Sequence, residues 1–293
     1  MIVVVGSVNI DLALRCEQLP LPGQTVSGHD FRTLPGGKGA NQAVAAARLG
    51  AEVAFVGCVG DDDFGRRARA VLDAEGISTA HLHTVAGSAT GVAMIFVEDS
   101  GQNCIALDGG ANAALSTTMV DAATTLIESA ALLICQLESP LPAVQRAIAI
   151  AHAAGVPVLL NPAPARELPA GLLAKVSMLV PNETEAAALA ALPTSAAFDV
   201  RAAADRLRVR GPRTVIVTLG AAGVHVADTS GHHTLPAPPV KAVVDTTGAG
   251  ETFIGAFAAA LCRGAVVLEA VDFAQRAAAF SPKFLGRRAA LNG

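Results

Sequence analysis

The sequence contains neither tryptophan nor tyrosine, and only 16% of its 293 residues are charged. Its net charge is −4, and its arginines are scattered along the chain and not gathered in a basic run with aromatic residues. A surface that binds nucleic acid normally needs a basic patch, often with side chains that stack on bases. We therefore expect no nucleic-acid partner.

The sequence also lacks a long apolar run, a secretory signal and paired cysteines. No stretch approaches the length of a membrane span, and the N-terminal run Met1–Gly6 has no basic segment and no cleavage site. The five cysteines are dispersed, odd in number and form no CxxC pair, which argues against disulfides or a thiolate metal site. These absences predict a cytoplasmic protein with buried free thiols and no membrane partner.

Apolar residues make up 52% of the chain, which is enough to bury a large core and excludes a disordered chain. From about residue 120, strand patterns alternate with helix patterns, as in strand 132–136, helix 141–153 and strand 158–160. This alternation predicts an α/β fold with a doubly wound, mostly parallel sheet. No linker or repeat divides the sequence, so we expect a single domain over residues 1–293.

Two stretches depart from this alternation. Residues 12–35 and 88–108 read as short strands separated by turn residues. We expect the two insertions to form one small antiparallel sheet outside the main sheet. A small sheet beside an α/β body is placed to act as a lid.

The stretch that carries the most chemistry is VVDTTGAGETFIGAF, residues 243–257. An apolar run followed by Gly248 and Gly250 predicts a strand, a tight turn and a buried helix. The free N–H groups at the start of that helix would bind phosphate, and Glu251 is a candidate general base. Taken alone, the stretch is explained equally well by a plain strand–turn–helix with an acid in its first turn.

Polar residues follow several of the predicted strands. Ligands of open α/β sheets bind beyond the carboxyl ends of the strands, so these residues predict a site there. The set comprises Asn9, Asp11, Glu138, Asn182, Glu185, Thr218 and Asp245.

Two pairs in this set suggest ligands. Asn9 and Asp11 are two residues apart, so both can face one side and bind sugar hydroxyls; an Asx turn is the alternative. Asn182 and Glu185 are three apart across a predicted helix start, and their oxygens suit Mg²⁺ with its waters. A capping box explains this second pair equally well.

Two further turns offer backbone to a ligand. The glycines of 36–37 precede a helical run at 43–49, with Lys38 and Asn41 as polar groups at the mouth of the turn. The turn at 218–223 offers a backbone surface on which a nucleotide can lie, or is a β-turn without chemical function.

Several of these runs resemble ribokinases of the PfkB family of carbohydrate kinases, and the similarity extends from Met1 to about Leu291. Gly50 and Gly60 also occur at the spacing expected of the family. The runs that carry the resemblance are GSVNID (6–11), GGKGANQA (36–43), QLESP (136–140), NPAPA (161–165) and PNETE (181–185).

The resemblance implies ATP-dependent phosphorylation of the 5-hydroxyl of D-ribose, with Mg²⁺, activation by K⁺ and a homodimer formed through the lid. The implied sugar contacts are Asn9, Asp11, Gly37, Lys38, Asn41, Ala93, Leu107 and Glu138. The implied ATP contacts are Asn182, Thr218, Gly220, Gly223 and Gln275. Gly248, Ala249 and Gly250 would form an anion hole beside the base Glu251. Asn182 and Glu185 would position Mg²⁺ through water, and Asp245, Thr247, Ser281, Phe284, Gly286 and Ala290 would surround K⁺.

The sequence departs from the family at two places. The usual base is Asp, whereas this chain has Glu251, whose extra methylene moves the carboxylate by on the order of 1 Å, a shift that can cost ~10²-fold in rate. The stretch after Phe280 contains Pro282 and Arg288 within the expected K⁺ loop and lacks the last helix expected of the family. Two alternatives therefore stay open: a kinase for another sugar or nucleoside, and a sugar-binding protein impaired in catalysis.

Overall fold

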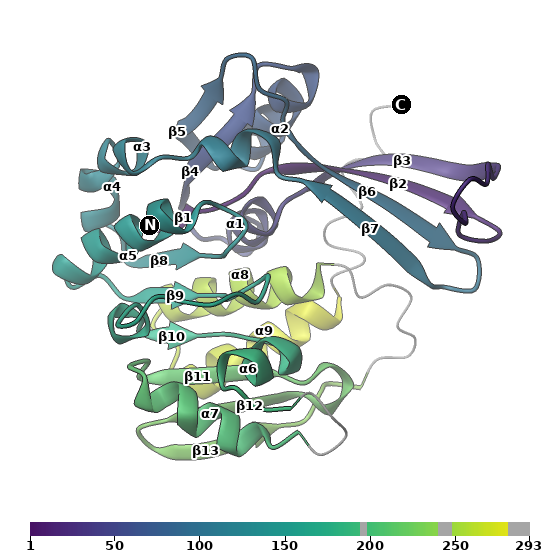
Figure 1. The fold of residues 1–293 in the computed structure, drawn as a ribbon. Coiled ribbons are helices and arrows are strands. Elements are labelled where there is room, and N and C mark those ends of the chain that lie inside the picture. The colour runs from purple at the N-terminus through teal and green to yellow at the C-terminus, as the bar shows by residue number, and fades with distance from the viewer. Residues whose placement is uncertain (194–197, 240–247, 281–293) are drawn as a thin grey trace.

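The computed structural model describes residues 1–193, 198–239 and 248–280, and a nine-stranded sheet lies at its centre (Figure 1). The strand order is β13-β12-β11-β10-β9-β8-β1-β4-β5. The strands are β1 (Ile2–Val5), β4 (Val53–Gly60), β5 (Ser78–Val85), β8 (Leu132–Cys135), β9 (Val158–Leu160), β10 (Met178–Leu179), β11 (Thr214–Thr218), β12 (Val224–Asp228) and β13 (Gly231–Leu235).

The strands from β11 to β5 run parallel to one another, and β12 and β13 add an antiparallel edge. This confirms the prediction of a doubly wound, mostly parallel sheet. The central strand β1 is wholly buried, which explains why its sequence is continuously β-branched and not alternating. Its carboxyl end, together with those of β8 to β11, forms the edge at which the polar residues gather.

Helices cover both faces of this sheet and enclose two buried clusters (Figure 1). One face carries α3 (Thr117–Asp121), α4 (Thr124–Glu128), α5 (Leu141–Ala153), α6 (Glu183–Leu189) and α7 (Val200–Val209). The other face carries α1 (Lys38–Arg48), α2 (Asp63–Ala74), α8 (Ala249–Cys262) and α9 (Val267–Ala279). Short 3-10 turns are η1 (Gly110–Ala114), η2 (Leu173–Lys175) and η3 (Gly220–Ala222).

A second, four-stranded sheet projects from the body (Figure 1). Its order is β3 (Gly28–Gly36), β2 (Asn9–Cys16), β6 (Gly91–Glu98) and β7 (Asn103–Asp108). The two outer pairings are antiparallel as expected, but β2 and β6 in the centre pair parallel. The sequence pattern could not reveal this, because side-chain alternation is the same for both strand directions. We call this sheet the lid.

The cysteines and the helices bear on two further expectations. All five thiols are free, and Cys16, Cys58 and Cys135 are buried, whereas Cys104 and Cys262 are exposed. The expectation of buried thiols is therefore wrong for these last two. Within the described ranges, no helix is both long enough and apolar enough to cross a membrane.

Candidate active site

A cavity of about 200 Å³ lies at the carboxyl ends of β9, β10 and β11. Six residues of the predicted site line it: Lys38, Asn182, Glu185, Thr218, Gly250 and Glu251. The structure thus brings the two Gly-rich turns, at the starts of α1 and α8, to the same place as the strand ends.

The first turn of α8 forms one wall of this cavity. Gly248 precedes the helix in the left-handed region, at φ 77°, which a residue with a side chain adopts only under strain. Gly250 and Glu251 follow in the first turn and line the cavity. Because the first N–H groups of a helix have no partner within it, this turn provides donors for an anion.

The first turn of α1 stands opposite and is joined to α8 by an ion pair. Lys38 Nζ lies 3.1 Å from Glu251 Oε1. The two helices pack closely because Gly255 has no side chain: a Cβ there would lie 2.6 Å from the Cβ of Ala45 and 2.6 Å from the carbonyl oxygen of Gln42. Small residues along this helix pair therefore set the distance between Lys38 and Glu251.

A cluster of carboxylates continues from this ion pair toward the lid. Glu138 Oε2 accepts hydrogen bonds from Ser7 Oγ at 2.5 Å and from the backbone N–H of Lys38 at 3.0 Å. Burial, together with the charges of Glu138 and Glu251, raises the pKa of Asp11 to about 6, although Lys38 opposes the shift. Burial lowers the pKa of Lys38, but Glu251 and Glu138 outweigh it, so this pKa is raised. The carboxylates of Asp11, Glu138 and Glu251 thus carry more negative charge than Lys38 neutralises.

Asn182 and Glu185 form the capping box, one of the two interpretations left open by the sequence, while their role toward Mg²⁺ stays a prediction. Asn182 Oδ1 accepts from the Glu185 N–H at 2.8 Å, and Glu185 Oε2 accepts from the Asn182 N–H at 2.9 Å, so the capping box is formed. Both residues also line the cavity. Burial raises the pKa of Glu185, and the charge of Glu251 adds to this. The cap orients the two side chains without using all of their oxygens.

The residues predicted to hold the sugar extend onto the lid. Asn9 and Asp11 are two residues apart in β2, so their side chains lie on the same face of the sheet. Asp11 pairs with Ala93 of β6, which pairs in turn with Leu107 of β7, so these three positions form one row across the lid. Ala93 is buried, whereas the Leu107 residue is 52% exposed.

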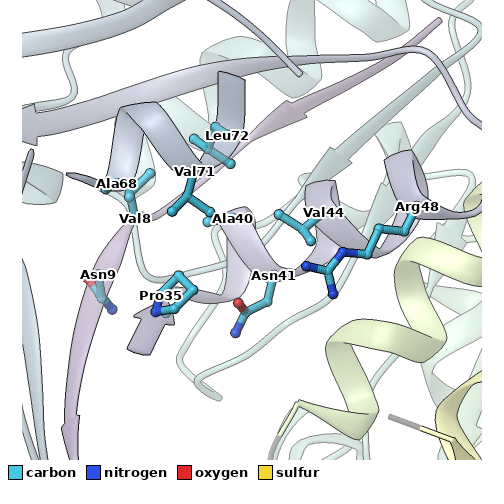
Figure 2. A pocket seen from close by; sticks show the side chains of 11 residues that line it. Val8, Asn9, Pro35, Ala40, Asn41, Val44, Arg48, Ala68, Val71 and Leu72 are labelled. Carbon is cyan, nitrogen blue, oxygen red and sulfur yellow. The ribbon is translucent and has the colours of Figure 1, made fainter. Parts of the chain in front are cut away.

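Asn9 and Asn41 also border a second, smaller pocket between α1 and α2 (Figure 2). Its opposite wall is apolar and comes from Ala68, Val71 and Leu72 of α2. Its volume of about 30 Å³ has room for little more than a water molecule. A pocket of this volume does not by itself enclose a sugar.

Several predicted residues lie elsewhere or are not described. Gly220 and Gly223 belong to the turn after β11, and Gln275 is buried on α9; none of the three lines the cavity. Gly223 has φ 99°, and a Cβ there would lie 2.1 Å from the carbonyl oxygen of Leu235, so the turn itself requires glycine. The predicted K⁺ residues lie outside the described residues: Asp245, Thr247, Ser281, Phe284, Gly286 and Ala290.

The prediction of site residues missed Asn161 and Ser7. Asn161 follows β9, lines the cavity, and its Oδ1 accepts from Gln42 Nε2 at 3.1 Å. Ser7 follows β1 and holds Glu138. Asn161 comes directly after the buried strand β9 and Ser7 two residues after the buried strand β1, so the rule that selected Asn9 and Asn182 was sufficient to find them.

The sequence profile of the pfkB family carbohydrate kinases matches residues 1–287. The chain belongs to this family. The ribokinase of Haemophilus influenzae is 42% identical over 278 residues, which cover 95% of this chain and 90% of that protein. The ribokinase of Schizosaccharomyces pombe is 43% identical over 289 residues, covering 96% and 91%. This member of the PfkB family is therefore a carbohydrate kinase, a phosphotransferase.

Solved structures and one further relative extend the comparison within the PfkB family. The structure of Arabidopsis thaliana ribokinase complexed with ribose and ATP matches with a TM-score of 0.89 and 35% identity, covering 95% of this chain and 91% of that one. This similarity confirms the predicted ribokinase-like fold. The deoxyribokinase of Salmonella typhi is 40% identical over 281 residues, covering 96% of this chain and 92% of that protein.

Proposed function

We propose that this PfkB-family chain transfers the γ-phosphoryl group of ATP to the 5-hydroxyl of D-ribose. One observation carries the proposal: Glu251, Lys38 and the first turn of α8 meet in one cavity. Phosphoryl transfer needs in-line positioning, neutralised charge and a base near the acceptor hydroxyl. The relatives that are ribokinases support ribose as the acceptor.

The proposed step uses Glu251 as the general base. Its carboxylate takes the proton of the sugar hydroxyl while that oxygen bonds to the γ-phosphorus and the bond from phosphorus to the ADP oxygen breaks. The N–H groups of the first turn of α8, including that of Gly250, stabilise the negative charge on the transferred group. Lys38 orients the Glu251 carboxylate through their ion pair and adds positive charge beside the phosphoryl group.

The residues present fit a divalent cation bound together with phosphate. Asp11, Glu138, Glu185 and Glu251 surround a single Lys38, and the raised pKa of Asp11 reflects this excess of negative charge. Among the described residues, no three of His, Cys, Asp or Glu form a metal site made only of protein. Mg²⁺ commonly keeps several waters and binds substrate phosphates. Asn182 and Glu185 would hold it through water, and the ion would neutralise phosphate charge.

The lid, K⁺ and the cellular location complete the proposal. Large apolar side chains are exposed on both faces of the lid: Phe31, Met94, Ile105 and Leu107, with Met94 on the face opposite to Ile105 and Leu107. A soluble monomer rarely exposes so many large apolar side chains, so we propose that two copies pair through their lids.

Activation by K⁺ stays a prediction from the resemblance, to be checked by exchanging K⁺ for Na⁺. We also propose a cytoplasmic location, which the free thiols support.

The test is ADP release with D-ribose, ATP, Mg²⁺ and K⁺. We expect turnover by the unaltered chain, and Glu251→Gln to lower kcat by about 10²–10⁴-fold, as loss of a general base does. Ribose binding by the variant, followed by calorimetry, should be little changed. Ribose binding by the unaltered chain without turnover would instead support the impaired sugar-binding protein, and Glu251→Asp would then be expected to turn over.

A second candidate is a 2-deoxyribose kinase, favoured by the similarity to the Salmonella typhi deoxyribokinase. The two substrates differ only in the 2-hydroxyl, so kcat/KM for each decides between them. A higher kcat/KM for deoxyribose would replace ribose as the proposed acceptor without changing the proposed chemistry.

A further inference from the structure

We infer that Asn112, which lies outside the cavity, is a positioning residue that makes Asn9 a hydrogen-bond donor to the sugar. The inference rests on the proposed function, because it concerns how the sugar is recognised. Asn112 lies on η1 and is only 2% exposed. Its side chain links the start of lid strand β2 to the turn that follows lid strand β7.

The backbone around Asn112 permits only one orientation of its amide. The N–H of Val8 donates to Asn112 Oδ1 at 2.8 Å, and Asn112 Nδ2 donates to the carbonyl oxygens of Val8 and Gly109, both at 2.9 Å. A backbone N–H only donates and a carbonyl only accepts. An inverted amide would lose all three bonds, so the side-chain oxygen and nitrogen are assigned without ambiguity.

This orientation determines that of Asn9. Asn112 Nδ2 also lies 2.7 Å from Asn9 Oδ1, so its two protons are shared among three acceptors. The Asn9 oxygen is therefore engaged inside the protein, and its Nδ2 is the group left for a ligand. Within the described residues, no acceptor receives a hydrogen bond from Asn9 Nδ2. Beside it, Asp11 offers only acceptors when ionised, so the two side chains present a donor and acceptors on one face.

Gly91 leaves the space that this amide pair occupies. Gly91 of β6 is the residue paired with Asn9 of β2. A Cβ at position 91 would lie 2.2 Å from Asn9 Oδ1 and 2.5 Å from Asn112 Nδ2. The two amides thus meet where β2 and β6 leave the body, and the contact fixes the Asn9 side chain at the base of the lid.

The test is a double-mutant cycle on ribose affinity, measured by calorimetry with the full chain. Asn112→Asp keeps the shape and the acceptor for Val8, but its second oxygen cannot donate to Asn9. The side-chain amide of Asn9 then rotates, so that its Nδ2 faces the new carboxylate at position 112 and its Oδ1 faces the sugar. We expect the ribose Kd and KM to rise about 10-fold, as for one lost hydrogen bond, with kcat changed less than 2-fold. In an Asn9→Ala background, Asn112→Asp should have no further effect on the Kd.

Thr90→Val is the matched control. Thr90 is buried next to Gly91 and bonds to Asp62 and to the Gly60 N–H, but not to Asn9. The substitution Thr90→Val should lower Tm without changing ribose affinity. If Asn112→Asp does not fold, Asn9→Asp decides, because it keeps an acceptor for Asn112 but offers the sugar no donor; its Kd should rise about 10-fold.

Three results would overturn the inference. Wild-type affinity in Asn112→Asp or Asn9→Asp shows that no donor from Asn9 is needed. If Asn112→Asp weakens ribose binding equally in the unaltered and the Asn9→Ala backgrounds, Asn112 does not act through Asn9. No ribose binding by the unaltered chain overturns the proposed function, and the inference with it.

Discussion

Replacement of Asp11 by Asn is expected to stabilise the protein while weakening its binding of sugar. Asp11 is a carboxylate in a partly buried position whose nearest charged neighbours include Glu138 and Glu251. Keeping Asp11 ionised is therefore unfavourable in free energy in the folded state. Asn has nearly the same shape and carries no charge, so the substitution removes this unfavourable energy without leaving a cavity.

The size of the effect follows from the pKa of Asp11, which rises from 3.8 to about 6 on folding. Each unit of pKa corresponds to 1.36 kcal/mol, so a shift of about two units corresponds to about 3 kcal/mol. Partial exposure reduces this, and we expect Asp11→Asn to raise the free energy of unfolding by about 1–3 kcal/mol at pH 8.

The dependence on pH has a definite sign. Between pH 3.8 and about 6, the folded state binds more protons at Asp11 than the unfolded state does. Stability from this group therefore falls as pH rises through that window, and the full loss is present above pH 6. The advantage of Asp11→Asn should be absent below about pH 4, grow between pH 4 and 6, and be complete above pH 6. The affinity of the unaltered chain for sugar should instead rise as pH rises, because only the ionised Asp11 carboxylate offers its full set of hydrogen-bond acceptors.

The assay is urea unfolding of both proteins between pH 4 and 8, analysed as the difference between them so that other titrating groups cancel. Ribose Kd is measured in parallel and should rise about 10–100-fold in Asp11→Asn at pH 8, as for lost bonds to a charged group. In the unaltered chain the affinity should fall as pH drops below 6. An Asp11→Asn protein that is less stable than the unaltered chain at pH 8 would refute the reasoning.

Two predictions concern the core and the lid. Phe257 is fully buried and its ring stacks on that of Phe253, so Phe257→Ala should lower the free energy of unfolding, measured in urea, by about 3–5 kcal/mol. Val209→Ala is the control at an 89% exposed site and should change this free energy by less than about 0.5 kcal/mol. Met94→Asp on the lid should convert a dimer to monomers in sedimentation velocity, while Val209→Asp leaves it intact. A Met94→Asp protein that is still a dimer would argue against pairing through the face of the lid that carries Met94.

The fold was predictable where strands are buried on both faces, and less so elsewhere. The continuous apolar runs of β1, β8, β9 and β11 were sufficient to locate those strands. The edge strands β5, β12 and β13 were not predicted as part of the main sheet, because they contain histidines and other polar residues. The sequence pattern over 119–129 predicts one helix, but the structure has two short helices there, α3 and α4. Helix α1 begins at Lys38, earlier than predicted, because Gly37 precedes it with a positive φ of 91° that turns the chain into the helix.

The candidate site was predictable from the position of polar residues after strands, but its pairings were not. Asn182 and Glu185 form the predicted capping box and also line the cavity, whereas their predicted role toward Mg²⁺ stays a prediction. The ion pair of Lys38 with Glu251 joins residues 213 positions apart, and no local pattern encodes it. Asn112 was overlooked because it follows no strand directly and acts on Asn9 through a side-chain contact.

The close packing of α1 against α8 determines how far the carboxylate of residue 251 has to extend to reach Lys38. Lys38 and Glu251 stand at the adjoining ends of two helices whose separation depends on the missing side chain at Gly255 and the methyl group of Ala45. A larger side chain at either position would push the helices apart, and a longer acid at position 251 would extend back across the gap. Helix spacing and acid length therefore act together on the distance between the two charged groups. In this chain a close seam, with Gly255 and Ala45 between the helices, occurs with glutamate, the longer of the two acidic residues, and the Glu251 carboxylate lies 3.1 Å from Lys38 Nζ.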